Sequence, residues 1–244
     1  MPSYVYHKGS LGDIIYSLPA ISCMERPCVF VLNGIKKEFW DNLYCLLKQQ
    51  PYIDDIVNYY YLSMDERKRL WRELRCIDMR DPFIEIIEKQ PCYNLPFLFL
   101  KMLNKNFDLN NKWLFNINPI RIKPIVISWT NRYHDHKIKN DYYILEKYKK
   151  YCIFLGHPID HEKFYKKYKI DIIHYRTRDL LEMAQIIKGG DLFIGNQSVG
   201  FALAEGMKHP RILERYSFKD NCIPHGIDWY DNISEDIIEK YLNK

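Results

Sequence analysis

Two short loops carry most of the residue types that can do chemistry, and the first lies near the N-terminus. The run from His7 to Asp13 (HKGSLGD) follows the strand-like residues 4–6. Gly9 and Gly12 let the backbone approach a ligand, and a helix that begins beside them offers free N–H groups. Asp13 is either a general base that removes a proton from an acceptor hydroxyl or an N-terminal capping residue. The loop lacks the GxGxxG pattern, so it gives little support to a dehydrogenase.

The second loop lies in the C-terminal half, where Gly195 to Gly200 (GNQSVG) follow the strand-like residues 191–194 and precede a helical pattern. Backbone N–H groups at that helix start can hold a diphosphate, and amide and hydroxyl side chains can bind ribose or sugar. A capped strand-to-helix turn without a ligand explains these residues equally well. The residues predicted to contact the donor, meaning the molecule that carries the diphosphate and the sugar, are Asn196, Gln197, Ser198, Val199, Gly200 and Glu205. Glu205 is alternatively a solvated carboxylate.

A third cluster, residues 130–137 (TNRYHDHK), follows the apolar run 125–129. Arg132 and Lys137 can neutralise a diphosphate. Such a contact strengthens as the leaving group gains charge, which is what catalysis requires. We therefore predict Arg132 as a catalytic residue and Lys137 as a donor contact.

Other positions bear on metal and base binding. His134 and His136 face the same way if the chain is extended there, but no compact third ligand accompanies them, and solvated loop histidines are the simpler interpretation. The chain contains no Asp-x-Asp pair, so we predict a route that uses cationic side chains and no metal. Gly156 ends the apolar run 151–155, at the edge where an open α/β sheet binds a base.

Composition bounds the class of protein. The 244 residues are 47% hydrophobic, which is enough for one large or two small packed domains. The formal charge of +5 permits an anionic ligand without demanding nucleic acid. Seven dispersed cysteines without a CxxC pair indicate reduced thiols, and the N-terminus shows no signal peptide, so we expect a cytoplasmic protein. The most apolar window, residues 95–103, is too short to span a bilayer and is predicted to be a buried helix.

The first half alternates between short apolar runs and amphipathic stretches, which indicates βαβ units and a mainly parallel sheet. We expect strands at 4–6, 28–32, 56–59 and 76–79, and helices at 13–24, 37–48 and 65–74. Polar and proline-containing segments at 104–111 and 116–124 break the pattern. They predict a boundary between an N-terminal domain, residues 1–115, and a C-terminal domain, residues 122–244.

The second half alternates again, so the whole chain is predicted to be α/β. We expect strands at 125–129, 151–155, 171–174, 192–194 and 211–213, and helices at 142–149, 162–168, 179–188 and 199–207. Thr177 is the expected cap of the third helix, with Asp179 in its first turn. Ser234 is the expected cap of a final helix.

Taken together, these motifs resemble the heptosyltransferase-like glycosyltransferases of family 9. Gly9-x-x-Gly12-Asp13 with Pro19 six residues on is similar to the N-terminal signature of that family. The stretch 192–210 (LFIGNQSVGFALAEGMKHP) is similar to its C-terminal donor loop, and residues 129–132 to its phosphate-contacting turn. The last match makes Thr130 and Asn131 implied donor contacts.

The resemblance implies a glycosyltransferase B fold with two Rossmann-like domains, a nucleotide-sugar site in the C-terminal half and an acceptor site in the N-terminal half. It also implies inversion at the anomeric carbon, with Asp13 as base. The sequence departs from the family pattern at three positions. Gln197 stands where an aspartate is expected, Val199 replaces a glycine, and Ala202 falls about where a histidine is expected.

The function predicted from the sequence is therefore a metal-independent inverting glycosyltransferase. Two half-molecules would close over a cleft and move sugar from a nucleoside-diphosphate sugar to a hydroxyl of a glycan or glycolipid. No cofactor is expected beyond that co-substrate, whose nucleobase the sequence leaves open. Two alternatives stand beside it: a glycosyltransferase acting on modified DNA bases, which the basic balance permits, and a catalytically silent nucleotide-sugar or glycan-binding module, which the altered donor loop motivates.

Overall fold

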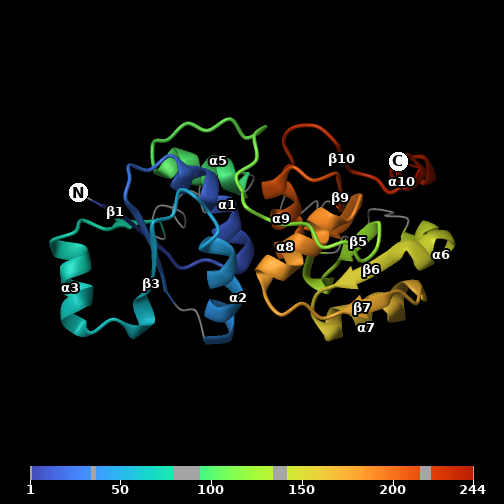
Figure 1. Cartoon of the computed structure of the whole chain (residues 1–244), viewed down its shortest axis with the longest axis horizontal. Helices are drawn as coiled ribbons and strands as arrows, with labels where there is room; N and C mark the ends of the chain where they lie inside the picture. The colour runs from blue at the N-terminus through green and yellow to red at the C-terminus, as the bar shows by residue number, and fades with distance from the viewer. Residues whose placement is uncertain (1, 34–36, 80–93, 134–141, 215–220, 244) are drawn as a thin grey trace. The chain divides into compact units, whose positions relative to one another are not determined.

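The structure is a computed structural model that describes residues 2–33, 37–79, 94–133, 142–214 and 221–243. The chain divides into two compact units. Unit 1 comprises Met1–Leu109 and Trp113–Asn116, and unit 2 comprises Asn110–Lys112 and Ile117–Lys244. Each unit contains its own parallel sheet with helices interleaved along the chain (Figure 1), which confirms the predicted α/β class.

Unit 1 contains a four-stranded sheet in the order β3-β2-β1-β4, and all of its strand pairs are parallel. The central strand β2 has the sequence CVFVL and is buried throughout, as a parallel strand covered on both faces must be. Its strands are β1 (Ser3–His7), β2 (Cys28–Leu32), β3 (Asp55–Asn58) and β4 (Ile77–Asp78), and its helices are α1 (Leu11–Ser22), α2 (Lys37–Leu47), α3 (Met64–Arg72) and α5 (Leu95–Met102), with a 3-10 turn η1 (Tyr59–Tyr61).

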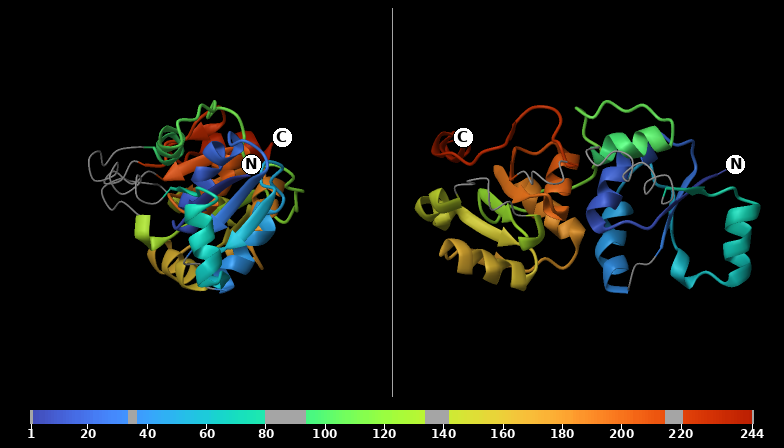
Figure 2. Two further views of the ribbon diagram at one scale, coloured as in Figure 1. Left: turned by 90° about the vertical axis from the view of Figure 1, so that its left-hand side faces the viewer. Right: turned by 180° about the vertical axis from the view of Figure 1, so that it is seen from behind.

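Side chains of alternate residues divide the unit 1 sheet between two packing layers. Tyr6, Val29 and Val31 pack with Leu70 of α3 on one face. Helices α1 and α2 lie on the opposite side of the strands from α3 (Figures 1 and 2). The apolar helix α5 packs against α1, as its predicted burial requires.

Unit 2 contains a six-stranded sheet in the order β10-β9-β8-β5-β6-β7, again parallel throughout. Three 3-10 turns, η2 (Asn131–Tyr133), η3 (Tyr142–Ile144) and η4 (Lys149–Tyr151), accompany the regular elements. The strands are β5 (Ile125–Ser128), β6 (Cys152–Leu155), β7 (Ile173–Tyr175), β8 (Leu192–Asn196), β9 (Arg211–Glu214) and β10 (Trp229–Tyr230), and the helices are α6 (Leu145–Tyr148), α7 (Pro158–Tyr168), α8 (Leu180–Gly189), α9 (Val199–Met207) and α10 (Glu235–Leu242).

The unit 2 sheet is covered on both faces. Ile125, Ile127 and Trp129 point into an aromatic core that includes residues of α7 and α10. The intervening residues face α8 and α9. There, a side chain at Gly190 or Gly200 would press on Val126 or Ser128. The end of β5 is therefore held tightly between two helical layers.

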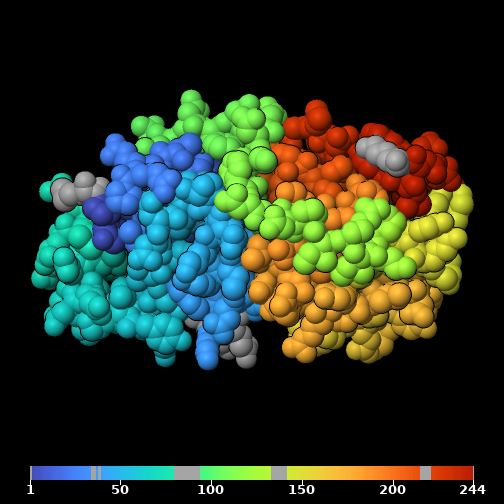
Figure 3. Space-filling view, viewed as in Figure 1, coloured from blue at the N-terminus to red at the C-terminus, as the bar shows by residue number. Residues whose placement is uncertain are grey.

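The segment that leads into β5 is fixed along α8. Ile120 N donates to Gln185 O at 2.9 Å, and Lys188 Nζ donates to Ile117 O at 2.6 Å. A side chain at Gly189 would overlap the Ile120 backbone. Figure 3 shows this stretch in light green at the surface, beside the orange residues of α8.

Within the described ranges, no helix is both long and apolar enough to cross a membrane.

Candidate functional site

The order of strands in unit 2 defines where its ligand site should lie. From β5 the chain adds β6 and β7 on one side, then returns to add β8 and β9 on the other side of β5. Ligands of open parallel sheets bind beyond the carboxyl ends of the strands at such a reversal. Thr130 and Asn131 follow β5, and Gln197 and Ser198 follow β8. Two of the three predicted donor clusters therefore meet at the reversal point of this sheet.

The Asn196 side chain ties these two turns together. Thr130 N donates to Asn196 Oδ1 at 3.1 Å, and Asn196 Nδ2 donates to Thr130 O at 2.6 Å. Asn196 is fully buried at the end of β8. Its amide adds one further pair of hydrogen bonds beyond Ser128 and Gly195, where the pairing of β5 with β8 ends. We conclude that Asn196 sets the relative position of the two loops.

The first turn of α9 presents polar groups in need of partners. The first intrahelical bond runs from Ala202 N to Ser198 O at 3.1 Å, so the N–H groups of Val199, Gly200 and Phe201 precede the hydrogen-bonded turns. Ser198 is the N-cap residue, but its side chain does not cap the helix.

Two hydroxyl groups at the same turns are also unpaired. Ser198 Oγ and Thr130 Oγ1 are buried, and neither has a hydrogen-bond partner among the described residues. A buried hydroxyl without a partner is destabilising, and it invites a ligand that supplies one. The α9 N-terminus and these hydroxyls together have the chemistry of an anion site.

The close approach of α9 to β5 depends on two glycines. A Cβ at Gly200 would lie 2.7 Å from Ser128 Oγ and 3.0 Å from Met183 Cε, and one at Gly195 would overlap Ser128 O. Ser128 is buried at 3% exposure and was not singled out by its sequence. No local pattern identifies it, because its importance comes from helix α9, which is distant in the chain.

The predicted catalytic residue Arg132 and the remaining predicted nucleotide-sugar contacts occupy varied environments. Arg132 and Asn131 are exposed in η2, directly after the β5 turn. Gln197 is 5% exposed, and its Nε2 donates to Asn221 Oδ1 at 3.4 Å. Gly156 follows β6 with φ of +138°, a conformation that favours glycine, and its carbonyl lies 2.9 Å from His174 Nε2. Lys137 lies outside the described residues, as do His134 and His136.

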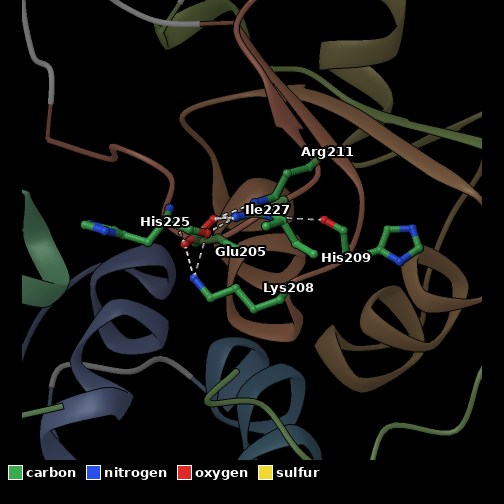
Figure 4. A network of polar contacts seen from close by, with 6 residues as sticks. All are labelled: Glu205, Lys208, His209, Arg211, His225 and Ile227. Carbon is green, nitrogen blue, oxygen red and sulfur yellow. Dashed lines mark hydrogen bonds and ion pairs between the residues drawn. The ribbon is translucent and has the colours of Figure 1, made fainter. Parts of the chain in front are cut away.

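Glu205 lies in a buried ion pair (Figure 4) and is not solvated, as one interpretation of the sequence had it. Its Oε2 accepts from Arg211 Nε at 2.5 Å, while its Oε1 accepts from Lys208 Nζ and from His225 N at 3.0 Å. Arg211 is also fully buried and donates to the carbonyl of His225 at 2.6 Å. The pair joins α9 to β9 and to the chain before β10.

Sequence reasoning also missed Glu214, the last residue of β9. It is 1% exposed and lies in register with Asn196 of β8, at the carboxyl edge of the sheet. The pKa of Tyr142 is raised well above its usual value, first by burial and then by this nearby carboxylate. An acidic residue directly after the apolar pair Ile212-Leu213 is the signal that could have identified it.

In unit 1 the loop after β1 likewise lies at a reversal point. From β1 the chain adds β2 and β3 on one side and β4 on the other. Asp13 lies in the first turn of α1, where its Oδ2 accepts from Ser10 N and Ser10 Oγ, each at 2.9 Å. Among the described residues, its Oδ1 has no hydrogen-bond partner. The carboxylate thus caps its own helix and still has one oxygen available.

The two glycines of the first loop differ in the space available for a side chain. A Cβ at Gly9 would overlap the His7 ring and lie 2.8 Å from Asp13 Cβ, so a side chain there has no room. A Cβ at Gly12 would meet nothing within 4 Å. Gly9 is therefore required by the packing of the loop, while Gly12 leaves open space beside the start of α1.

In the part of the chain that the structure describes, no group of three or more His, Cys, Asp or Glu residues could hold a metal ion.

No protein-family model matches this sequence, and no curated protein sequence matches it at a significant level. Several solved structures share its fold. The glycosyl transferase family 9 protein of Veillonella parvula has a TM-score of 0.57 at 12% identity, over 100% of this chain and 89% of that chain. The E. coli heptosyltransferase WaaC with ADP-2-deoxy-2-fluoro heptose has a TM-score of 0.57 at 10% identity, over 100% and 99% of the two chains.

E. coli ADP-heptose LPS heptosyltransferase II gives a TM-score of 0.57 at 10% identity, over 100% of this chain and 98% of that chain. Identities this low establish the fold and leave the activity to be argued from the site. The structural resemblance to family 9 glycosyltransferases that the sequence motifs indicate is confirmed: the chain has the α/β fold of the heptosyltransferases.

Proposed function

We propose that this protein is an inverting, metal-independent glycosyltransferase that moves a sugar from a nucleoside-diphosphate sugar to a hydroxyl of a glycan or glycolipid. The observation that carries the proposal is the set of unpaired polar groups at the start of α9. Ser198 Oγ and Thr130 Oγ1 are buried at the reversal point of the unit 2 sheet, beside a helix N-terminus, and neither has a hydrogen-bond partner in the part of the chain that the structure describes. The shared fold supports a sugar-transfer reaction over other chemistry that uses an anion site.

In this proposal unit 2 binds the donor. The N–H groups of Val199 and Gly200 and the two hydroxyls hold the diphosphate, whose negative charge the α9 dipole favours. Arg132 lies exposed on the adjacent turn and pairs with the phosphate oxygens as they gain charge. Lys137 is a second proposed cation, outside the described residues. Asn131, Gln197 and Gly156 complete the proposed donor contacts.

Unit 1 supplies the base. Asp13 takes the proton of the acceptor hydroxyl as that oxygen attacks the anomeric carbon. The bond from the anomeric carbon to the diphosphate oxygen breaks, and the nucleoside diphosphate leaves with the electron pair. Attack opposite the leaving group inverts the anomeric configuration. The hydrogen bonds from Ser10 to Oδ2 support this role because they orient the carboxylate while Oδ1 has no described partner.

The roles of Asn196 and Glu205 differ from the direct donor contacts that their sequence predicts. We propose that each positions the donor site: Asn196 joins the two loops through Thr130, and Glu205 anchors α9 through Arg211. A cytoplasmic location is also part of the proposal, because seven cysteines without a CxxC pair suit a reducing compartment.

A thermal-shift titration with ADP, UDP, GDP, CMP and dTDP tests donor binding. ADP leads the panel because structures of WaaC hold ADP-2-deoxy-2-fluoro heptose and ADP. A ligand at 100 times its dissociation constant stabilises the folded state by about 2.7 kcal/mol. We expect one nucleotide to raise the melting temperature of the wild type. The rise should be much smaller in Ser198→Ala.

A matched control and a second assay sharpen this test. Ser234 caps α10 by accepting from Ile237 N at 3.3 Å, so Ser234→Ala weakens a helix cap in the same unit and should leave the nucleotide shift intact. Donor hydrolysis or transfer is then measured with the sugar form of the tightest nucleotide. Binding without either would favour the silent module, and salt-sensitive DNA binding would favour transfer to DNA bases. A chain that binds no nucleotide is not a nucleotide-sugar transferase.

A further inference from the structure

His7, the last residue of β1, is a buried imidazole that contacts the first loop. It is 4% exposed and packs against Phe99 with ring centroids 5.2 Å apart. Its Nδ1 accepts a hydrogen bond from Gly9 N at 2.8 Å. A ring that accepts at Nδ1 must be neutral and carry its proton on Nε2, because a protonated imidazolium has no acceptor. Burial lowers the pKa of His7 to about 3, so the acceptor persists at physiological pH.

Gly9 lies between this imidazole and Asp13. A single added Cβ at Gly9 would overlap His7 Cε1 and lie 2.8 Å from Asp13 Cβ. Gly9 is therefore packed closely against both side chains. Because Ser10 is bonded directly to Gly9, the position of Gly9 against the ring constrains the position of the Ser10 backbone.

Ser10 is the residue that orients the Asp13 carboxylate. Its N and Oγ both donate to Asp13 Oδ2 at 2.9 Å. One end of the loop is thus fixed by an imidazole nitrogen and the other by a carboxylate oxygen. The two ends are joined through one residue, Gly9, whose N–H donates to the ring.

We propose that His7 is a positioning residue for Asp13: its Nδ1 fixes the Gly9 peptide, which places the two Ser10 donors that orient the carboxylate. This inference rests on the proposed role of Asp13 as base. In this role His7 differs from an ordinary core histidine in one respect. A core residue would need only the shape of the ring, whereas this role needs a hydrogen-bond acceptor at the position of Nδ1.

Three substitutions separate shape from acceptor. His7→Phe keeps an aromatic ring between Phe30 and Phe99 but has no acceptor. His7→Asn can place an amide oxygen where Nδ1 lies, and His7→Gln places its amide one bond further out, near the position of Nε2. His209→Phe is the control, because His209 is a half-buried histidine of unit 2 whose pKa is lowered by burial to about 4.

The first measurement is independent of activity. In NMR spectra of the full chain, we expect the Gly9 amide proton to exchange at least about tenfold faster in His7→Phe and His7→Gln than in the wild type, and the Asp13 Cγ resonance to move. His7→Asn and His209→Phe should match the wild type in both. An unchanged Gly9 exchange rate or an unchanged Asp13 resonance in His7→Phe overturns the inference, whether or not the protein transfers sugar.

The second measurement is the transfer reaction with saturating acceptor. We expect His7→Phe to lower kcat by at least about tenfold, because small displacements of a catalytic group are costly, with the donor KM unchanged. His7→Asn should restore most of the loss. Equal kcat in the wild type and His7→Phe would refute the positioning role. If the wild type transfers no sugar, the proposed function fails, and the Asp13 resonance still decides the role of His7.

Discussion

The buried ion pair of Glu205 and Arg211 makes a quantitative prediction about unit 2. Arg211 is fully buried, and Glu205 Oε2 lies 2.5 Å from its Nη2. In Glu205→Gln the side chain keeps its size but loses its charge, so a buried guanidinium remains uncompensated. Removing one partner of a buried pair typically costs about 3–5 kcal/mol. Because domains are stable by only about 5–15 kcal/mol, the variant should lose a large part of the free energy of unfolding of unit 2.

The matched control is an ion pair at the surface of the same unit. Arg121 Nη2 lies 2.6 Å from Asp191 Oδ2, and the two side chains are 56% and 31% exposed. Solvent screens this pair, so Asp191→Asn should cost less than about 1 kcal/mol. Both variants are unfolded in urea and followed by circular dichroism. The midpoint for Glu205→Gln should fall well below that of the control. Equal midpoints would show that the Arg211 guanidinium finds compensation elsewhere and would refute the reasoning.

Further predictions concern acid stability, packing and catalysis. The folded-state pKa values of His7 and His209 are lowered by burial to about 3 and about 4, from 6.5, so both are neutral when folded. The contribution of each histidine to the free energy of unfolding is present above pH 6.5 and is lost as the pH falls toward its folded-state pKa, by about 1.4 kcal/mol per pH unit. The urea midpoints of the wild type at pH 7 and pH 4.5 should therefore differ strongly. The difference should be smaller in His209→Phe. Gly200→Ala should destabilise by about 1–3 kcal/mol because of its contact with Ser128 and abolish the nucleotide-dependent thermal shift. Asp13→Asn should abolish transfer and leave the dissociation constant of the nucleotide within about twofold; loss of binding with retained turnover would contradict the assigned role.

Local chemistry made most elements predictable and failed where two local signals compete. Residues 179–188 were expected to form a helix capped by Thr177, but Asp179 is the cap, and its side chain accepts from Glu182 N at 2.8 Å. Thr177 as the cap was therefore wrong, because aspartate is the better capping residue when both lie near the helix start. The Ser234 cap was predicted correctly. The two-residue strand β10 (Trp229–Tyr230) was missed because it is too short for periodicity to register.

The site was predictable only as far as it follows from strand ends. Loops at the carboxyl ends of parallel strands are where ligands bind, so the turns at Gly9–Asp13 and Gly195–Gly200 could be located from sequence. Contacts between elements distant in the chain could not be located in this way. Glu205 and Arg211 are only six residues apart, yet their pairing requires the chain to turn from α9 into β9. Ser128 matters because Gly200 approaches it, which no property of either residue indicates alone.

The charges at the two helix starts argue for which unit holds the diphosphate. Both loops join a β-strand to a helix at a reversal point, so topology alone does not distinguish them. The first turn of α1 contains Asp13, whose negative charge already occupies the positive end of that helix. The first turn of α9 contains no acidic residue and has no side-chain cap, and Ser198 Oγ beside it has no described partner. A diphosphate would meet repulsion at α1 and unsatisfied donors at α9, so we expect nucleotide-induced changes in amide resonances to centre on residues 198–201. Changes centred on residues 10–13 would reverse the assignment of donor and acceptor units.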